Sequence, residues 1–232
     1  MRDYLVFTLT ATFGAMGELA GHERRGSWDW PGRSAILGLL GAALGIRRDG
    51  DFSSLDALSV AVAVFDEGRP LREYHTVQTI PTAKVKRPQS RPHALHAAGG
   101  GVNTTITHRD YRTCSLFGIA IAGDGLENIA EALKEPVFTL YLGRKSCPLS
   151  APLAPQIIAA PDVETALAGA RMPPWWPEAG RLATRLYSDM PDAEGERSET
   201  RHDRPLDRRL WHFTERSFAV KTVQIRPQQG SA

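Results

Sequence analysis

The order of the strongly patterned segments constrains the fold of this chain more than any other sequence feature. Three runs rich in β-branched and aromatic residues predict strands, namely Tyr4–Thr10 (YLVFTLT), Ser59–Asp66 (SVAVAVFD) and Cys114–Gly123 (CSLFGIAIAG). A helical pattern follows the first run and another follows the third. The spacing therefore predicts a fold that mixes helices with a sheet.

The two helices carry their own start and stop signals. In the first, which begins near Arg33 (RSAILGLLGAALGIRRD), apolar residues recur at helical spacing, and Ser34 is the predicted N-cap. In the second (DGLENIAEALKEP), Asp124 is the predicted N-cap, Glu127 its capping-box partner and Pro136 the stop.

A further extended segment, Val137–Tyr141, completes the order strand, helix, strand, strand, helix, strand. This order is typical of an α+β, ferredoxin-like fold, in which two helices back one face of an antiparallel sheet. We expect a ferredoxin-like domain over residues 1–170. Residues 171–232 are expected to form a small β-rich C-terminal extension, because WHFTERSFAVKTVQI is rich in strand formers.

The connection between the second and third predicted strands, Glu67–Thr113, is far longer than usual. Between Arg72 and Arg112 it holds seven cations against two anions, a local excess of +5. The cations are Arg72, Lys84, Lys86, Arg87, Arg91, Arg109 and Arg112. Such a segment predicts a basic arm or hairpin that projects from the sheet and follows a phosphate backbone. A disordered insertion kept soluble by its charge is the alternative.

The charge of the whole chain limits the possible partners. A formal net charge of +2 is too small to indicate a nucleic-acid binder from composition alone, so any basic surface must be local. From Arg181 to Arg216, eight arginines are matched by eight acidic residues, which predicts a solvated region of salt bridges. With two cysteines, no leader-like start and no long apolar run, we expect a soluble cytoplasmic protein that does not contact the membrane.

Enzyme motifs are weak. His93 and His96 lack further ligands at suitable spacing, so we expect no metal and no cofactor. The HRD run at His108–Asp110 lacks the asparagine that kinases place five residues after the aspartate, where this chain has Ser115. A nucleophile elbow of the G-x-S-x-G type is also missing from the sequence.

The run YLGRKSCPLSAPL, Tyr141–Leu153, places Arg144, Lys145 and Ser146 together before two prolines. Paired cations, a hydroxyl and backbone N–H groups can hold a phosphate. A solvated turn is the alternative.

The sequence resembles the CasD family in four stretches: PGRSAILGLLGAALGIRRD, REYHTVQ, ITHRDYRTCSLFGIAI and FTLYLGRKSCPLSAPL. These proteins are subunits of the type I-E CRISPR Cascade surveillance complex and bind the five-prime handle of the guide RNA. The resemblance implies a ferredoxin-like RNA-binding fold whose long arm, the thumb, hooks over the guide RNA. It also implies that the subunit caps one end of the complex. The implied partners are CRISPR guide RNA, the backbone subunit and the large subunit, with target DNA reached indirectly through the complex.

Residues in the matching stretches are the candidate RNA contacts. Tyr111 is a candidate for stacking on an RNA base, because proteins that bind single-stranded RNA commonly stack splayed bases on aromatic rings. The full set of candidates is Arg33, Ser34, His75, Arg109, Tyr111, Arg112, Arg144, Lys145 and Ser146.

One departure and one alternative accompany the resemblance. The family often has a glutamine and a tryptophan in the loop after the first strand, where this chain has Gly14 and Met16, although Met16 can still pack against a base.

Related subunits of subtype I-C cut guide precursors without metal. His75 and Tyr111 could do such general acid–base work here. The resemblance to the I-E branch favours a non-catalytic scaffold, with a metal-independent endoribonuclease or a generic ferredoxin-like interaction module as alternatives.

Overall fold

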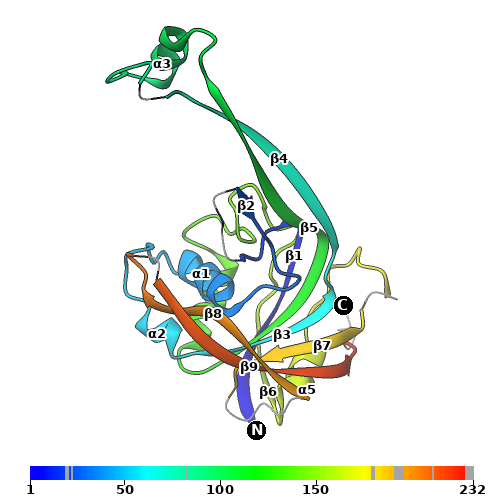
Figure 1. Ribbon diagram of the computed structural model, residues 1–232. Helices are drawn as coiled ribbons and strands as arrows, with labels where there is room; N and C mark the ends of the chain where they lie inside the picture. Colours follow the sequence, from blue (N-terminus) through cyan, green and yellow to red (C-terminus); the bar gives the residue numbers. More distant parts are fainter. Residues whose placement is uncertain are drawn as a thin grey trace.

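The computed structural model of the protein describes residues 1–18, 21, 23–81, 83–178, 181–190, 196–210 and 212–227. One sheet organises these residues (Figure 1). Its strands are β1 (Arg2–Gly14), β2 (Arg24–Arg25), β3 (Ser59–Asp66), β4 (Arg69–Thr79), β5 (Asn103–Ala122), β6 (Gln156–Ala160), β7 (Ala183–Ser188), β8 (Arg197–Asp207) and β9 (His212–Ile225). The helices are α1 (Arg33–Ala43), α2 (Ser53–Asp56), α3 (Arg91–Ala98), α4 (Leu126–Lys134) and α5 (Val163–Ala168).

The centre of the sheet is antiparallel. The strands lie in the order β6-β1-β5-β3-β7-β9-β8, with β2 and β4 paired to β5 outside this path. Ile119 of β5 lies between Phe7 of β1 and Val62 of β3 in the register. The predicted strands at Tyr4–Thr10 and Ser59–Asp66 are confirmed, and so is the mixed fold with an antiparallel sheet.

Both faces of the central sheet are buried. Side chains alternate between faces along a strand, so Leu5, Phe7 and Leu9 of β1 lie on the face covered by α1 and α4. Tyr4 and Val6 lie on the opposite face, which α5 and the segment after it cover. The sequence pattern predicted the first helical layer, whereas the short α5 was missed.

Neither predicted N-cap is made. Helix α1 starts at Arg33 with Gly32 as its N-cap, so Ser34 lies inside the first turn and makes no capping hydrogen bond. Helix α4 has Gly125 at its N-cap with a φ of 74°, which displaces Asp124 from the capping position and Glu127 from the box. The N-cap of α1 therefore lies two residues before the predicted one, and that of α4 lies one residue after it.

The prediction of a strand at Val137–Tyr141 is wrong. The Val137 and Phe138 N–H groups donate to the carbonyls of Ala43 and Ala42, at 3.0 and 3.1 Å. Carbonyls in the last turn of a helix have no partner within the helix, and this segment supplies one. The next strand after α4 is instead β6, which pairs with β1.

The C-terminal strands continue the same sheet. Strand β7 pairs with β3, β9 with β7 and β8 with β9. Tyr187 of β7 and Phe218 of β9 belong to the buried cluster that contains α1, and Trp30 stacks on Tyr187 with ring centroids 4.0 Å apart. The β-rich extension thus shares its core with the N-terminal elements.

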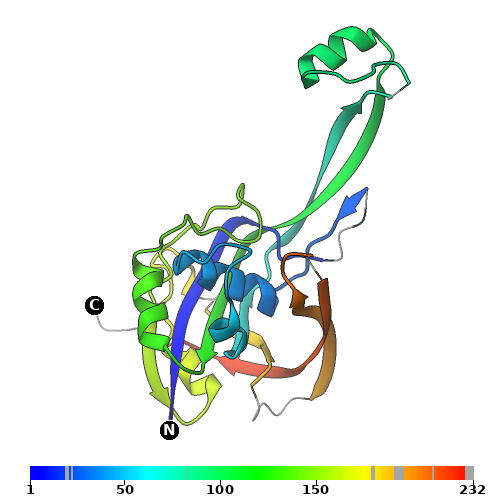
Figure 2. The ribbon, with the colours of Figure 1, turned by 90° about the vertical axis from the view of Figure 1, so that its left-hand side faces the viewer.

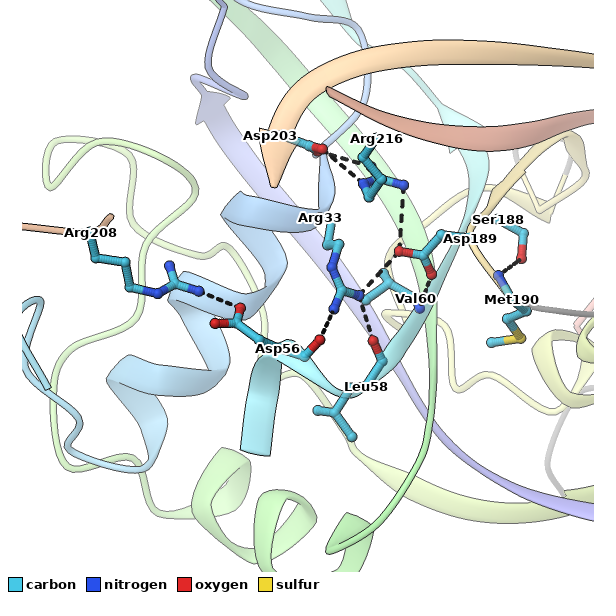
Figure 3. Close-up of polar contacts among 10 residues, drawn as sticks. All are labelled: Arg33, Asp56, Leu58, Val60, Ser188, Asp189, Met190, Asp203, Arg208 and Arg216. Carbon is cyan, nitrogen blue, oxygen red and sulfur yellow. Dashed lines mark hydrogen bonds and ion pairs between the residues drawn. The ribbon is translucent and has the colours of Figure 1, made fainter. Parts of the chain in front are cut away.

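The expectation that the arginines of this region are solvated is wrong for the pairs around Asp189 (Figure 3). Asp189 accepts hydrogen bonds from Arg33 at 3.1 Å, from Arg216 at 3.4 Å and from the Val60 N–H at 2.5 Å. Arg216 also donates to both oxygens of Asp203. These four side chains are about nine-tenths buried, so the ion network holds α1, β3 and the C-terminal strands together.

Replacing Asp189 by alanine leaves two buried guanidinium groups without their shared acceptor. We expect Asp189→Ala to lower the free energy of unfolding by about 3–5 kcal/mol, measured by urea denaturation followed by circular dichroism. The control is Glu131→Ala, which removes an exposed pair with Lys134 and should change it by less than about 1 kcal/mol. Equal effects of the two substitutions would contradict a buried network.

Candidate nucleic-acid interface

A two-stranded hairpin projects from the sheet (Figures 1 and 2). Strand β4 pairs with the first half of β5, from Arg69 opposite Thr113 to Thr79 opposite Asn103. Helix α3 lies at the far tip, where the Ser90 side chain accepts from the His93 N–H at 3.3 Å and caps the helix. The long basic connection therefore forms an extended hairpin with a helical tip, and β5 begins well before the predicted Cys114.

The pairing sorts the charged residues of the hairpin onto two faces. Residues that oppose each other in an antiparallel pair share a face, and neighbours along a strand do not. Glu73 lies opposite Arg109, and Tyr111 follows two residues later on the same face as His75. Arg72, Asp110 and Arg112 lie on the other face.

Arg144 joins the first face from a distant part of the chain. Its guanidinium carbon lies 4.5 Å from the centroid of the Tyr111 ring, and its Nη2 donates to the Arg25 carbonyl at 3.3 Å. The Tyr111 hydroxyl donates to Glu73 at 3.2 Å, and His75 Nδ1 lies 3.5 Å from the same carboxylate. We call these five residues the hairpin-root cluster: Glu73, His75, Arg109, Tyr111 and Arg144.

Three nitrogen atoms of the hairpin-root cluster are buried and make no hydrogen bond within the described part of the chain. They are His75 Nδ1, Arg109 Nε and Arg144 Nη1. A buried donor without a partner costs about 1–3 kcal/mol. Two guanidinium groups with spare donors, held on one face, can bind an anion once they rotate toward it.

The loop that carries Arg144 is tightly built. Leu142 N–H donates to the Cys147 carbonyl at 2.9 Å, and Cys147 N–H donates to the Arg144 carbonyl at 2.8 Å. Gly143 has a φ of 83°, and a Cβ there would lie 1.6 Å from the Ala15 carbonyl oxygen, so only glycine fits. Burial raises the pKa of the Cys147 thiol, which keeps it protonated at neutral pH. Lys145 and Ser146 are exposed at the turn of this loop.

Several predicted contacts lie elsewhere. Arg33 is buried and donates to the carbonyls of Leu58 at 2.5 Å and Asp56 at 2.7 Å besides its pair with Asp189, so the prediction of an RNA contact there is wrong (Figure 3). Arg112 lies on the second face of the hairpin, near Glu67.

The structure also bears on the remaining predicted residues. Tyr111 is only 9% exposed and has Arg144 over its ring, so it is not available as a stacking platform. Ser34 lies partly exposed on a groove beside α1.

On the second face of the hairpin root, the sequence did not predict the ion pairs of Asp110. Asp110 accepts from Arg72 at 2.7 Å and from Arg24 of β2 at 2.8 Å. The hydrogen bond from Arg72 is the main cause that lowers the pKa of Asp110 to about 2, and Arg24 adds to it. The arginine at position 24 is paired here because β2 runs parallel to β5, with Arg24 opposite His108. No local spacing in the sequence indicates that contact.

A groove beside α1 lies near the hairpin root. It has a volume of about 940 Å³ and lies between α1 and residues 138–143. Met16, Leu39, Phe138 and Tyr141 contribute apolar surface to it. Gly143 lines the groove and directly precedes Arg144, so the groove lies next to the hairpin-root cluster.

Within the described ranges, His, Cys, Asp and Glu side chains nowhere form a group of three that could hold a metal ion. None of the helices within those ranges has the length and apolar character needed to cross a membrane.

Comparison with known proteins identifies the family. The profile of a family described as "CRISPR-associated protein (Cas_Cas5)" matches residues 4–219. The chain belongs to the Cas5 family. This match confirms the family resemblance drawn from the four sequence stretches.

A curated relative and two solved structures agree with this assignment. The CRISPR system Cascade subunit CasD of Escherichia coli (strain K12) is 35% identical over 184 residues, an alignment that covers 72% of this chain and 76% of the relative. A chain of a structure titled "CRISPR RNA-guided surveillance complex" has a TM-score of 0.70 at 23% identity, with 97% of this chain and 95% of that chain covered. A "Crystal structure of Cas protein" has a TM-score of 0.65 at 24% identity and covers 98% and 100%. These two likenesses show that the fold is shared.

The state of Asp110 can be tested directly. Its pKa in the folded protein lies below the ordinary 3.8, so its contribution to stability is present above pH 4 and is lost as the pH falls toward 2. We expect the NMR shift of the Asp110 carboxyl carbon to titrate with a midpoint near 2. Arg72→Ala should move the midpoint upward. A wild-type midpoint near 3.8 would contradict the paired geometry.

Proposed function

We propose that this chain is the non-catalytic, guide-RNA-binding subunit of a type I-E Cascade complex. In this proposal it holds the five-prime handle of the CRISPR RNA in the cytoplasm and caps one end of the complex beside the large subunit. Membership of the Cas5 family and the similarity to CasD of Cascade support the assembly. The hairpin-root cluster carries the RNA-binding part of the proposal, because its two arginines have buried donors that make no hydrogen bond within the described ranges.

The strand order supports a ferredoxin-like RNA-binding unit within residues 1–170. Across the sheet, four of the strands lie in the order β6-β1-β5-β3, which are the fourth, first, third and second of them in chain order. This antiparallel arrangement, with α1 and α4 on one face, is consistent with the ferredoxin-like pattern. Residues 171–232 would then act as an extension that braces the unit through β3 and the ion network at Asp189.

The projecting hairpin corresponds to the thumb in this proposal. Its tip lies far from the core (Figures 1 and 2), and Ala94 is the buried residue of α3. Residues 80–102 contain four cations, at positions 84, 86, 87 and 91, and no acidic residue. We propose that this tip contacts the neighbouring backbone subunit and the RNA that the subunit carries, while target DNA is reached only through the complex.

Binding should depend on salt through the phosphate contacts of Arg144 and Lys145. We expect the double substitution Arg144→Ala/Lys145→Ala to reduce the slope of log K against log salt by about 0.7 per lost contact, measured by titrating the full chain into labelled CRISPR-repeat RNA. Lys134→Ala, on α4, is the matched control because it removes a cation that pairs with Glu131. An unchanged slope in the double variant would contradict the proposed contacts.

The same RNA distinguishes a scaffold from a nuclease. Tyr111 is buried and its hydroxyl already donates to Glu73, which does not favour its use as a general acid or base. We therefore expect bound RNA to remain intact on a denaturing gel after incubation in EDTA. A discrete cut at the handle boundary by this chain alone would instead assign it as a metal-independent endoribonuclease.

Assembly should depend on the hairpin tip. Deleting Lys84–Gly101 removes α3 but leaves the paired strands, which end at Thr79 and Asn103, so the core should keep its melting temperature. We expect the deletion to prevent co-purification with the backbone subunit. Normal assembly of the deleted chain would rule out the proposed role of the tip.

A further inference from the structure

The groove beside α1 has an open floor that packing does not explain. Gly38 lies in the middle of α1 and is exposed, and a Cβ placed there would meet no atom of the described residues within 4 Å. Glycine inside a helix costs about 0.5–1 kcal/mol relative to alanine. Gly41, three residues later, is needed for packing because a Cβ there would lie 2.6 Å from the Phe52 ring. Gly38 has no such neighbour among the described residues, so its main physical effect there is to leave space in the groove.

The opposite wall offers aromatic surface to that space. Phe138 is 40% exposed and Tyr141 is 41% exposed, and both line the groove with Met16. The volume of about 940 Å³ is in the range of sites for small organic ligands, about 300–1,000 Å³. Exposed aromatic rings beside an open apolar floor suit a flat, unsaturated group.

The charges around the groove favour an anionic ligand. Arg47, Arg48 and Arg208 line it against one carboxylate, Asp49. Arg208 is partly neutralised by Asp56, and Arg47 is exposed on the rim. At the other end, Gly143 leads directly to Arg144 of the hairpin-root cluster. Cations thus flank the apolar floor on both sides.

We infer that this groove holds an unstacked nucleobase of the bound RNA. The base would lie over Gly38 between α1 and the rings of Phe138 and Tyr141, while the flanking phosphates face Arg47 and the hairpin-root cluster. This alternation of apolar floor and cationic ends matches the alternation of base and phosphate in a single strand. The inference rests on the proposed RNA-binding function and adds a site for a base to it.

The inference can be tested by a substitution at Gly38 that occupies the free volume of the groove. Gly38→Phe places a ring in open space and improves helix propensity, so the protein should stay folded. Gly38→Ala is the control, with a larger gain in helix propensity but little added volume. With the full chain and CRISPR-repeat RNA, we expect Gly38→Phe to weaken binding roughly tenfold and Gly38→Ala less than twofold. The salt slope should not change, because no phosphate contact is removed.

A double-mutant cycle identifies the occupant. Repeat RNAs that lack one base at a time are titrated against the wild type and Gly38→Phe. At one position we expect the missing base to weaken wild-type binding and to have little further effect on Gly38→Phe. Tyr141→Ala provides a second cycle from the opposite wall if Gly38→Phe does not fold.

Three results would overturn the inference. Wild-type affinity in Gly38→Phe, or losses that add independently at every position, would show that no base occupies the groove. Weakened assembly with a partner protein at unchanged RNA affinity would assign the groove to a protein side chain. Absence of RNA binding by the wild type would instead remove the proposed function itself, which the salt-slope experiment tests separately.

Discussion

The continuous strand β5 is the constraint on which the other features depend. Its 20 residues pair with β1 and β3 along the buried half and with β4 along the exposed half. Between the two halves, Cys114 has a φ of 56°, which is strained for a residue with a side chain. Because one strand belongs to both core and hairpin, the direction of the hairpin is fixed by the pairing of the core. The hairpin-root cluster lies at this transition.

The buried ion network has a different role from the cluster. Arg33 and Arg216 are held by shared carboxylates inside the fold, and their charges are not available to a ligand. Buried pairs of this kind do not necessarily add net stability, because desolvation opposes the attraction. Their partners are specific, however, so the network fixes how α1 lies relative to β3 and the C-terminal strands. The position of Phe138 beside α1 is set separately, by the hydrogen bonds from the Val137 and Phe138 N–H groups to the carbonyls of Ala43 and Ala42.

Local periodicity was enough to predict β1, β3, the buried half of β5 and the two principal helices, because these elements bury a repeated pattern. Interactions between distant residues explain the errors. Arg33 looked like a phosphate ligand at a helix start, but its partner Asp189 lies 156 residues away in sequence. Val137–Tyr141 has strand-forming residues, yet the last carbonyls of α1 bind its N–H groups. Of the candidate site, the sequence predicted His75, Arg109, Tyr111 and Arg144, but not Glu73, which accepts from Tyr111.

The positive charge of the hairpin is unevenly available. At its root, Arg72 is paired with Asp110 and Arg112 lies 3.9 Å from Glu67, so the excess of cations counted in the sequence is largely neutralised there. Arg109 instead lies on the other face of the hairpin. Arg144 reaches this face from the loop of residues 141–147. An anion at the root should therefore be held by few, well-oriented donors, which favours a defined phosphate position. The tip carries four cations without a nearby acidic residue in sequence. Such a cluster produces a diffuse positive field, which would not fix the register of a nucleic-acid strand.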